Sequence, residues 1–157
     1  MIRAARSVAA FWLVCACSAA GSAPTTDTQP DFPDSYRDSF VEVRSCRPSG
    51  DHNLNNVRVL ATPRAEPAYR SHAAPFSQGD VLLKEEFEFG DSNCSGAPTR
   101  WTSMLRLGQK HAGVDGWRWE RVDPGRDVVE IDSAACMGCH AACGVAPDGF
   151  ESTCGQQ

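Results

Sequence analysis

Cys136, Cys139 and His140 form a C-x-x-C-H string near the C-terminus, and this string constrains the possible folds more than any other feature. Two thiols at this spacing lie on one helical turn and can add to the two vinyl groups of a heme. The imidazole beside the second cysteine then ligates the iron. We therefore expect a short C-terminal helix that holds one covalent heme c against the rest of the fold.

Two other uses of these cysteines stay open. Together with Cys143, the string could form a Cys3His zinc site, or the cysteines could pair as disulfides. Zinc is geometrically awkward, because adjacent Cys139 and His140 would both have to face one tetrahedral centre. Structural zinc sites normally draw their ligands from two separated pairs. Heme attachment is the favoured interpretation.

Residues 1–17 are typical of a signal peptide, because Arg3 and Arg6 precede an apolar run too short to span a bilayer. Residues 14–17 resemble a lipobox, in which case Cys17 would be lipidated and would anchor the protein to a membrane. Ordinary cleavage near Ser18 would instead release the protein. Both routes predict a periplasmic protein, either free or lipid-anchored to the periplasmic face of a bacterial membrane.

Residues 18–34 are rich in Ser, Thr and Pro and have no hydrophobic period, which predicts a flexible linker. Residues 35–157 are predicted to form one small heme domain. The chain carries 15 Lys and Arg against 20 Asp and Glu, a formal net charge of −5. This acidic balance argues against a nucleic-acid partner.

Four cysteines are left outside the leader and the C-x-x-C-H string: Cys46, Cys94, Cys143 and Cys154. An even number in an oxidising compartment predicts two disulfides. Four cysteines allow three connectivities, and the sequence does not choose among them. We favour Cys143–Cys154, since these two flank a turn-forming segment, together with Cys46–Cys94.

Six segments carry strand signals, with turn signals between them, and apolar–polar alternation is clearest in the first three. They are residues 40–44, 57–60, 81–89, 101–107, 117–122 and 128–131. Only residues 64–72 and the heme segment, 133–142, favour helices. Short strands at turn-separated intervals predict an α+β fold that is mainly antiparallel β.

The order of these features resembles the cytochrome P-460 and cytochrome c′-beta family over roughly residues 35–140. The landmarks are residues 43–46 (VRSC), 75–85 (PFSQGDVLLKE), 116–124 (GWRWERVDP) and the C-x-x-C-H string. The resemblance implies an antiparallel sheet of about five strands with two or three helices. It also implies a five-coordinate heme c on the C-terminal helix, and a homodimer.

The resemblance further suggests site residues. P-460 members carry a lysine cross-linked to the porphyrin, and Lys84 falls on that position; the alternative is a solvated strand lysine. Phe76 and Phe40 are candidates for an apolar distal wall, or else belong to the sheet core. Asp132 is a candidate proton relay or a cap of the heme helix, a capping role for which Ser133 competes.

The function implied by this resemblance is an open iron site that binds or oxidises a small nitrogen species. P-460 members oxidise hydroxylamine and pass electrons to a periplasmic redox partner, whereas c′-beta members bind nitric oxide. An oxidoreductase and a non-enzymatic nitric oxide binder therefore both stay open. A six-coordinate electron-transfer cytochrome is the alternative. Its sixth ligand would come from His52, His72, His111 or Met104.

Overall fold

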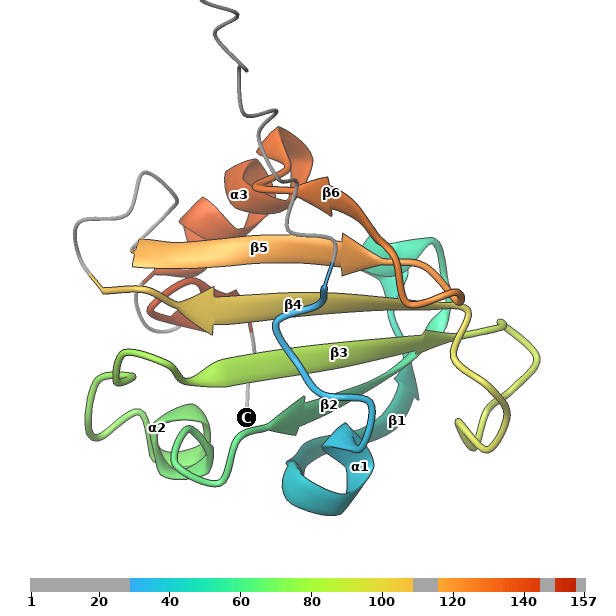
Figure 1. Cartoon of the computed structure of the whole chain (residues 1–157), viewed down its shortest axis with the longest axis horizontal. Helices are drawn as coiled ribbons and strands as arrows, with labels where there is room; N and C mark the ends of the chain where they lie inside the picture. The colour runs from blue at the N-terminus through green and yellow to red at the C-terminus, as the bar shows by residue number, and fades with distance from the viewer. Residues whose placement is uncertain (1–28, 109–115, 145–148, 155–157) are drawn as a thin grey trace, which may run out of the picture.

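A six-stranded antiparallel sheet with short helices dominates the computed structural model, which describes residues 29–108, 116–144 and 149–154 (Figure 1). The strands of the sheet are β1 (Val41–Pro48), β2 (Asn56–Ala61), β3 (Val81–Phe87), β4 (Arg100–Arg106), β5 (Trp117–Val122) and β6 (Val128–Ile131). The helices are α1 (Tyr36–Ser39), α2 (Glu66–Ser71), α3 (Ala134–His140) and the single 3-10 turns η1 (Gly50–His52) and η3 (Ala141–Cys143). A separate hairpin consists of β7 (Gly149–Phe150) and β8 (Thr153–Cys154).

The sheet is a meander, in which the strands lie side by side in chain order and each neighbouring pair is antiparallel. The predicted fold, α+β and mainly antiparallel β, is confirmed. The count of about five strands is too low, because Val128–Ile131 pairs with β5 and adds an edge strand. No helix among the described residues is long and apolar enough to cross a membrane.

Residues 31–40 cover one face of the sheet, which we call the strap face (blue in Figure 1). Phe32 is 3% exposed, and its ring centroid lies 5.4 Å from that of Tyr36 and 6.3 Å from that of Trp101. Phe32 falls inside the predicted linker, residues 18–34, so the folded domain begins before Ser35. The buried core of this face consists of Phe32, Tyr36, Leu60, Leu83, Trp101 and Val122.

Glu85 lies on the strap face without solvent exposure and fixes the strap to the sheet. The Tyr36 hydroxyl donates to Glu85 Oε1 at 2.5 Å, and Arg37 Nη2 donates to the same oxygen at 2.8 Å. Arg58 Nε of β2 donates to Oε2 at 2.6 Å. A four-residue helix is unstable alone, and a buried carboxylate needs partners. Glu85 anchors α1 to the sheet, and the Tyr36 and Arg37 side chains of α1 give the buried Glu85 carboxylate its partners.

The two disulfides are Cys46–Cys94 and Cys143–Cys154, which confirms the favoured pairing. Their Cα atoms lie 5.6 Å and 4.9 Å apart, respectively. The two cross-links close chain segments of different size, with sequence separations of 48 and 11 residues. Since the entropy removed from the unfolded chain grows with the closed loop, Cys46–Cys94 is the larger constraint on unfolding.

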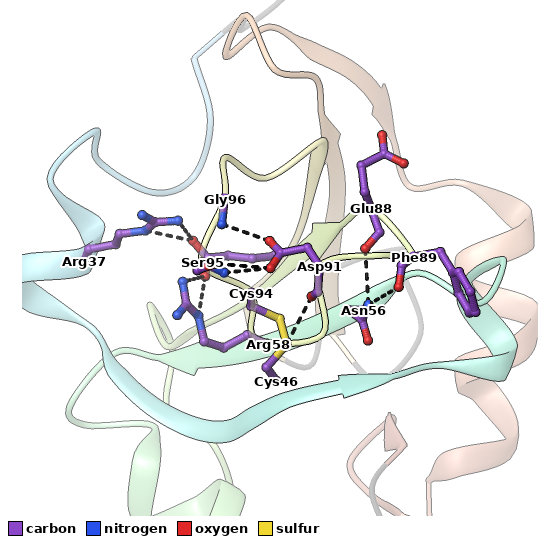
Figure 2. The surroundings of a disulfide bond; sticks show 11 residues. Arg37, Cys46, Asn56, Arg58, Glu88, Phe89, Asp91, Cys94, Ser95 and Gly96 are labelled. Carbon is purple, nitrogen blue, oxygen red and sulfur yellow. Dashed lines mark hydrogen bonds and ion pairs between the residues drawn. A yellow bond between two sulfur atoms is a disulfide. The ribbon is translucent and has the colours of Figure 1, made fainter.

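The Cys46–Cys94 disulfide joins β1 to the loop between β3 and β4 (Figure 2). Asp91 closes that loop, because its carboxylate accepts backbone N–H bonds from Ser95 at 3.1 Å and Gly96 at 2.9 Å. These hydrogen bonds lower the pKa of Asp91. The loop is thus fixed by its own turn as well as by the cross-link.

Glu120 is a second buried carboxylate of the strap face, 2% exposed. Its oxygens accept bonds from the Asp31 backbone N–H at 2.9 Å, from Arg118 Nη2 at 3.1 Å and from the Ser103 hydroxyl at 3.3 Å. Burial raises the pKa of Glu120 to about 7. The Asp31 carboxylate adds to that increase, while the Asp31 N–H and the Arg118 guanidinium oppose it.

We predict that Glu120 makes folding pH-dependent. Its pKa is about 7 in the folded protein against an ordinary value of 4.5, so the folded state retains a proton that the unfolded chain releases between these values. The free energy of unfolding should therefore fall as the pH rises through this window, by up to about 3 kcal/mol from this group. Urea unfolding at several pH values measures the slope.

Glu120→Gln does not titrate and should flatten that slope. The matched control is Glu88→Gln, which changes an exposed carboxylate and should keep the wild-type slope. Equal slopes for wild type and Glu120→Gln would contradict the prediction.

Candidate functional site

A pocket of about 450 Å³ lies on the sheet face opposite the strap, which we call the pocket face. The strand registers arrange the side chains of its floor in three rows across the sheet. The first row is Val57, Glu86 and Arg100, the second is Val59, Lys84, Thr102 and Arg121, and the third is Leu82, Met104 and Trp119. The floor therefore changes from charged to apolar along the strands, and η1, α2, α3 and β8 line the remaining sides.

The helix α3 brings Cys136, Cys139 and His140 to one wall of this pocket. Residues three and four positions apart lie on the same side of a helix, which is why the string can face a single ligand. Cys136 and Cys139 are the free cysteines among the described residues. Because Cys143 is disulfide-bonded to Cys154, the alternative Cys3His zinc site is wrong.

His140 is oriented by two contacts. Its Nδ1 donates a hydrogen bond to the Ser152 carbonyl at 2.8 Å, and its ring meets the Trp119 ring nearly edge-on, with centroids 4.4 Å apart. Burial lowers the pKa of His140 and so favours the neutral ring, and the Ser152 hydrogen bond opposes this with a smaller effect. With its proton on Nδ1, the imidazole presents Nε2 as the atom able to ligate a metal.

Lys84 points into the pocket and its side chain is 17% exposed, so the solvated alternative is wrong. Its Nζ lies 3.0 Å from Glu86 Oε1 and 2.9 Å from His52 Nδ1. Burial lowers the pKa of Lys84, and the attraction of Glu86 opposes this effect. A buried amine with a lowered pKa is more often neutral and therefore more nucleophilic than a surface lysine.

Glu86 is a pocket residue that the sequence did not single out, and His52, expected only as a candidate sixth ligand, contacts Lys84 there. The Thr102 hydroxyl donates to Glu86 Oε1 at 3.3 Å, and Arg100 Nη1 lies 3.7 Å from Glu86 Oε2. Burial alone would raise the pKa of Glu86, but the attraction of Lys84 and Arg100 outweighs it and leaves the pKa lowered. The strand alternation, which puts positions 84 and 86 on one face, was the available signal for Glu86.

The other predicted residues lie elsewhere. Phe76 packs edge-on against Trp117, with centroids 5.1 Å apart, in the core beside the pocket and not in its lining. Phe40 packs near Tyr36, 6.4 Å between centroids, on the strap face. The structure therefore does not bring Phe40 to the pocket, because the chain enters β1 from the opposite side of the sheet.

Asp132 joins the start of α3 to β5. Its Oδ1 accepts the Trp119 backbone N–H at 2.9 Å, and its own N–H donates to the Trp119 carbonyl at 2.8 Å. Asp132 is not in the pocket lining, and Ser133, at the N-cap, makes no side-chain capping bond. The contacts of Asp132 thus position α3 and Trp119 relative to each other.

Two of the candidate sixth ligands, His52 and Met104, line the pocket. His72 instead stacks on Phe150, with ring centroids 4.9 Å apart. His111 lies outside the described residues.

The lining fits a porphyrin with two propionate groups. Trp119 Nε1 is buried without a hydrogen-bond partner among the described residues. Arg47 is half-buried, and no ion pair or hydrogen bond of its side chain occurs in the part of the chain that the structure describes. Burial, and then the nearby Arg44, lower the pKa of Arg47. Two free thiols, one imidazole nitrogen, an apolar row and donors that lack acceptors suit an apolar macrocycle with carboxylate substituents.

Comparison with known families gives one match. A family model described as Cytochrome P460 matches residues 33–145, well over half of the chain. The matched range contains the whole six-stranded sheet and the C-x-x-C-H string, and it ends before the β7–β8 hairpin. No curated protein matches the chain.

Proposed function

We propose that this protein, which belongs to the cytochrome P460 family, is an exported heme c protein. Its open iron site would bind or oxidise small nitrogen species such as hydroxylamine or nitric oxide. Family membership implies a heme cofactor. The observation that carries the proposal is the pocket in which Cys136, Cys139 and His140 share one cavity with the buried amine of Lys84.

In this proposal α3 supplies the attachment. The Cys136 and Cys139 thiols would hold the porphyrin by thioether bonds, and His140 Nε2 would ligate the iron. When bound, the heme would supply a redox-active iron with one axial position open to a small ligand. The apolar row formed by Leu82, Met104 and Trp119 would support the macrocycle, whereas Arg47 and Trp119 Nε1 would donate to its carboxylates.

Lys84 is proposed to bond covalently to a carbon of the porphyrin edge. The new N–C bond would replace one N–H and one C–H bond, releasing two protons and two electrons, and a two-electron oxidant such as a peroxide would accept the electrons. Its Nζ faces the same cavity as the attachment cysteines, and burial lowers its pKa, which increases the share of nucleophilic neutral amine. A bond from Lys84 of β3 would hold the macrocycle at a second point besides α3. Distortion of the macrocycle is one way in which a protein changes the electronic properties of the iron.

Proton transfer is proposed to use Glu86 and His52. Oxidation of hydroxylamine releases protons together with electrons, so a proton acceptor is needed near the substrate. Glu86 Oε1 and His52 Nδ1 both lie within 3.0 Å of Lys84 Nζ in the pocket, whereas Asp132 is outside its lining. Glu86 is therefore a better candidate than Asp132 for the relay carboxylate. The electrons would leave to a periplasmic redox partner.

Electron transfer is the second candidate function, because Met104 and His52 line the pocket and either could fill the sixth position. Export, lipidation of Cys17 and formation of a homodimer also stay proposals. The expected leader, residues 1–17, lies outside the described residues.

We predict that the denatured full-length protein, produced with export and heme attachment, carries the added mass of one heme. Cys136→Ala together with Cys139→Ala should abolish this covalent mass, because no thiol is left to form a thioether. The matched control is Cys46→Ala with Cys94→Ala, which removes a remote disulfide and should keep the heme. A wild-type chain without heme mass would sink the proposed function.

Lys84 should give a spectroscopic signature if its amine is bonded to the porphyrin. We predict that the main visible band of the reduced protein is red-shifted and reverts to an ordinary c-type position in Lys84→Leu. Lys84→Arg, which keeps a cation at this position, should revert as well. An ordinary band in the wild type would rule out the cross-link and leave the attachment through α3 intact.

Open and filled axial sites differ in ligand binding. We predict that the reduced protein binds nitric oxide stoichiometrically without loss of an internal ligand, as followed by its visible spectrum. Turnover of hydroxylamine with an artificial electron acceptor then separates an enzyme from a binder, and Glu86→Gln should slow any turnover. Failure to bind nitric oxide would favour the electron-transfer candidate.

A further inference from the structure

The hydrogen-bond acceptor of His140 comes from a segment beyond the family match. The match ends at residue 145, and the β7–β8 hairpin spans residues 149–154. Its turn delivers the Ser152 carbonyl to His140 Nδ1 at 2.8 Å. The ring orientation of the proposed iron ligand thus depends on a short hairpin that lies beyond the matched range.

The turn of this hairpin is conformationally unfavourable without support. Glu151 and Ser152 have φ values of 45° and 64°, the left-handed conformation that a two-residue hairpin turn requires. Glycine or asparagine is preferred at such positions, so two other residues in a row need outside contacts to hold them.

Those contacts come from the main domain. Trp117 Nε1 donates to the Glu151 carbonyl at 2.9 Å, and the Phe76 backbone N–H donates to Glu151 Oε2 at 3.0 Å. Ser152 has no solvent exposure. The acceptor for His140 is therefore held inside the protein by the same aromatic core that borders the pocket.

The Cys143–Cys154 disulfide ties the hairpin to the segment that carries the axial ligand. Cys143 follows His140 by three residues, in the η3 turn that continues α3. The hairpin packs closely on this turn, because a Cβ atom at Gly149 would lie 2.3 Å from the Cys143 carbonyl oxygen and 2.5 Å from that of Thr153. Only glycine permits this approach. Close packing at Gly149 and the Cys143–Cys154 disulfide together fix the distance between the hairpin and η3.

We propose that the β7–β8 hairpin and its Cys143–Cys154 disulfide are a positioning device for the axial ligand. They hold the Ser152 carbonyl where it keeps the proton of His140 on Nδ1 and fixes the ring plane. A carbonyl acceptor on Nδ1 increases the basicity of Nε2. A more basic axial nitrogen stabilises the oxidised iron and lowers the reduction potential. This inference rests on the proposed heme attachment.

The test compares two holoproteins that each lack one disulfide: Cys143→Ala with Cys154→Ala, and Cys46→Ala with Cys94→Ala. The readouts are the reduction potential and, by NMR of the reduced carbon monoxide complex, the exchange rate of the His140 ring proton. The first variant should have a more positive potential and faster exchange of the ring proton than the wild type. The second should match the wild type in both, although its disulfide closes the longer loop and its loss should cost more stability.

A second pair of variants leaves all cysteines in place. Gly149→Ala should push the hairpin from η3 and shift the potential in the same direction as loss of the Cys143–Cys154 disulfide. Gly90→Ala is the matched control, because an added Cβ there meets no heavy atom within 4 Å, so its potential should stay at the wild-type value.

Equal shifts in both disulfide variants, or no shift in either, would overturn the inference while the heme remains attached. A wild-type chain without covalent heme would overturn the proposed function and this inference together. The two failures are therefore distinguishable by the mass of the denatured chain.

Discussion

The burial of strand β3 on both faces is the constraint on which the rest of the structure depends. Its central residues, Lys84, Glu85 and Glu86, are consecutive charged side chains in a strand that is covered on both sides. A buried charge is costly unless it is paired. Glu85 therefore needs the strap, with its Tyr36 and Arg37 donors, while Lys84 and Glu86 pair with each other on the pocket face.

Successive side chains of β3 point to opposite faces of the sheet, and the two faces have different properties. The strap face is closed by aromatic packing and by fully paired carboxylates, so it stabilises the domain. The pocket face has an excess of positive charge, because its lining contains four cationic side chains and the acidic Glu86. The whole chain, in contrast, has a net charge of −5. An anionic group such as a propionate is attracted into it, whereas hydroxylamine and nitric oxide, which are neutral, gain no electrostatic steering. The cationic lining includes Arg47, Lys84, Arg100 and Arg121.

Local patterns predicted the strands, the C-x-x-C-H helix and the Cys143–Cys154 disulfide, because strand signals, helical spacing and flanking turns are properties of neighbouring residues. Cys46–Cys94 was favoured only as the remaining pair. They did not predict what covers each face. Alternation placed Lys84 on a polar face, but whether that face meets water depends on η1 and α3, which are distant in sequence. For the same reason the sequence did not show that Phe32, inside the predicted linker, is buried, or that Phe40 packs on the strap face and not in the pocket. The strap lies on that face through contacts with Glu85 and Trp101.

The limits of the family match separate two parts of the proposed site. Residues 33–145 include the sheet, the pocket floor, Lys84 and the C-x-x-C-H string, whereas Thr153 and Cys154 of the hairpin line one side of the pocket. The acceptor of His140 Nδ1 is supplied by the hairpin after them. A chain with the same domain and a different C-terminal segment would need another acceptor for that proton, and its Nε2 basicity would differ. In the proposed site, the reduction potential would therefore change through the C-terminal segment without any change in the residues that contact a substrate.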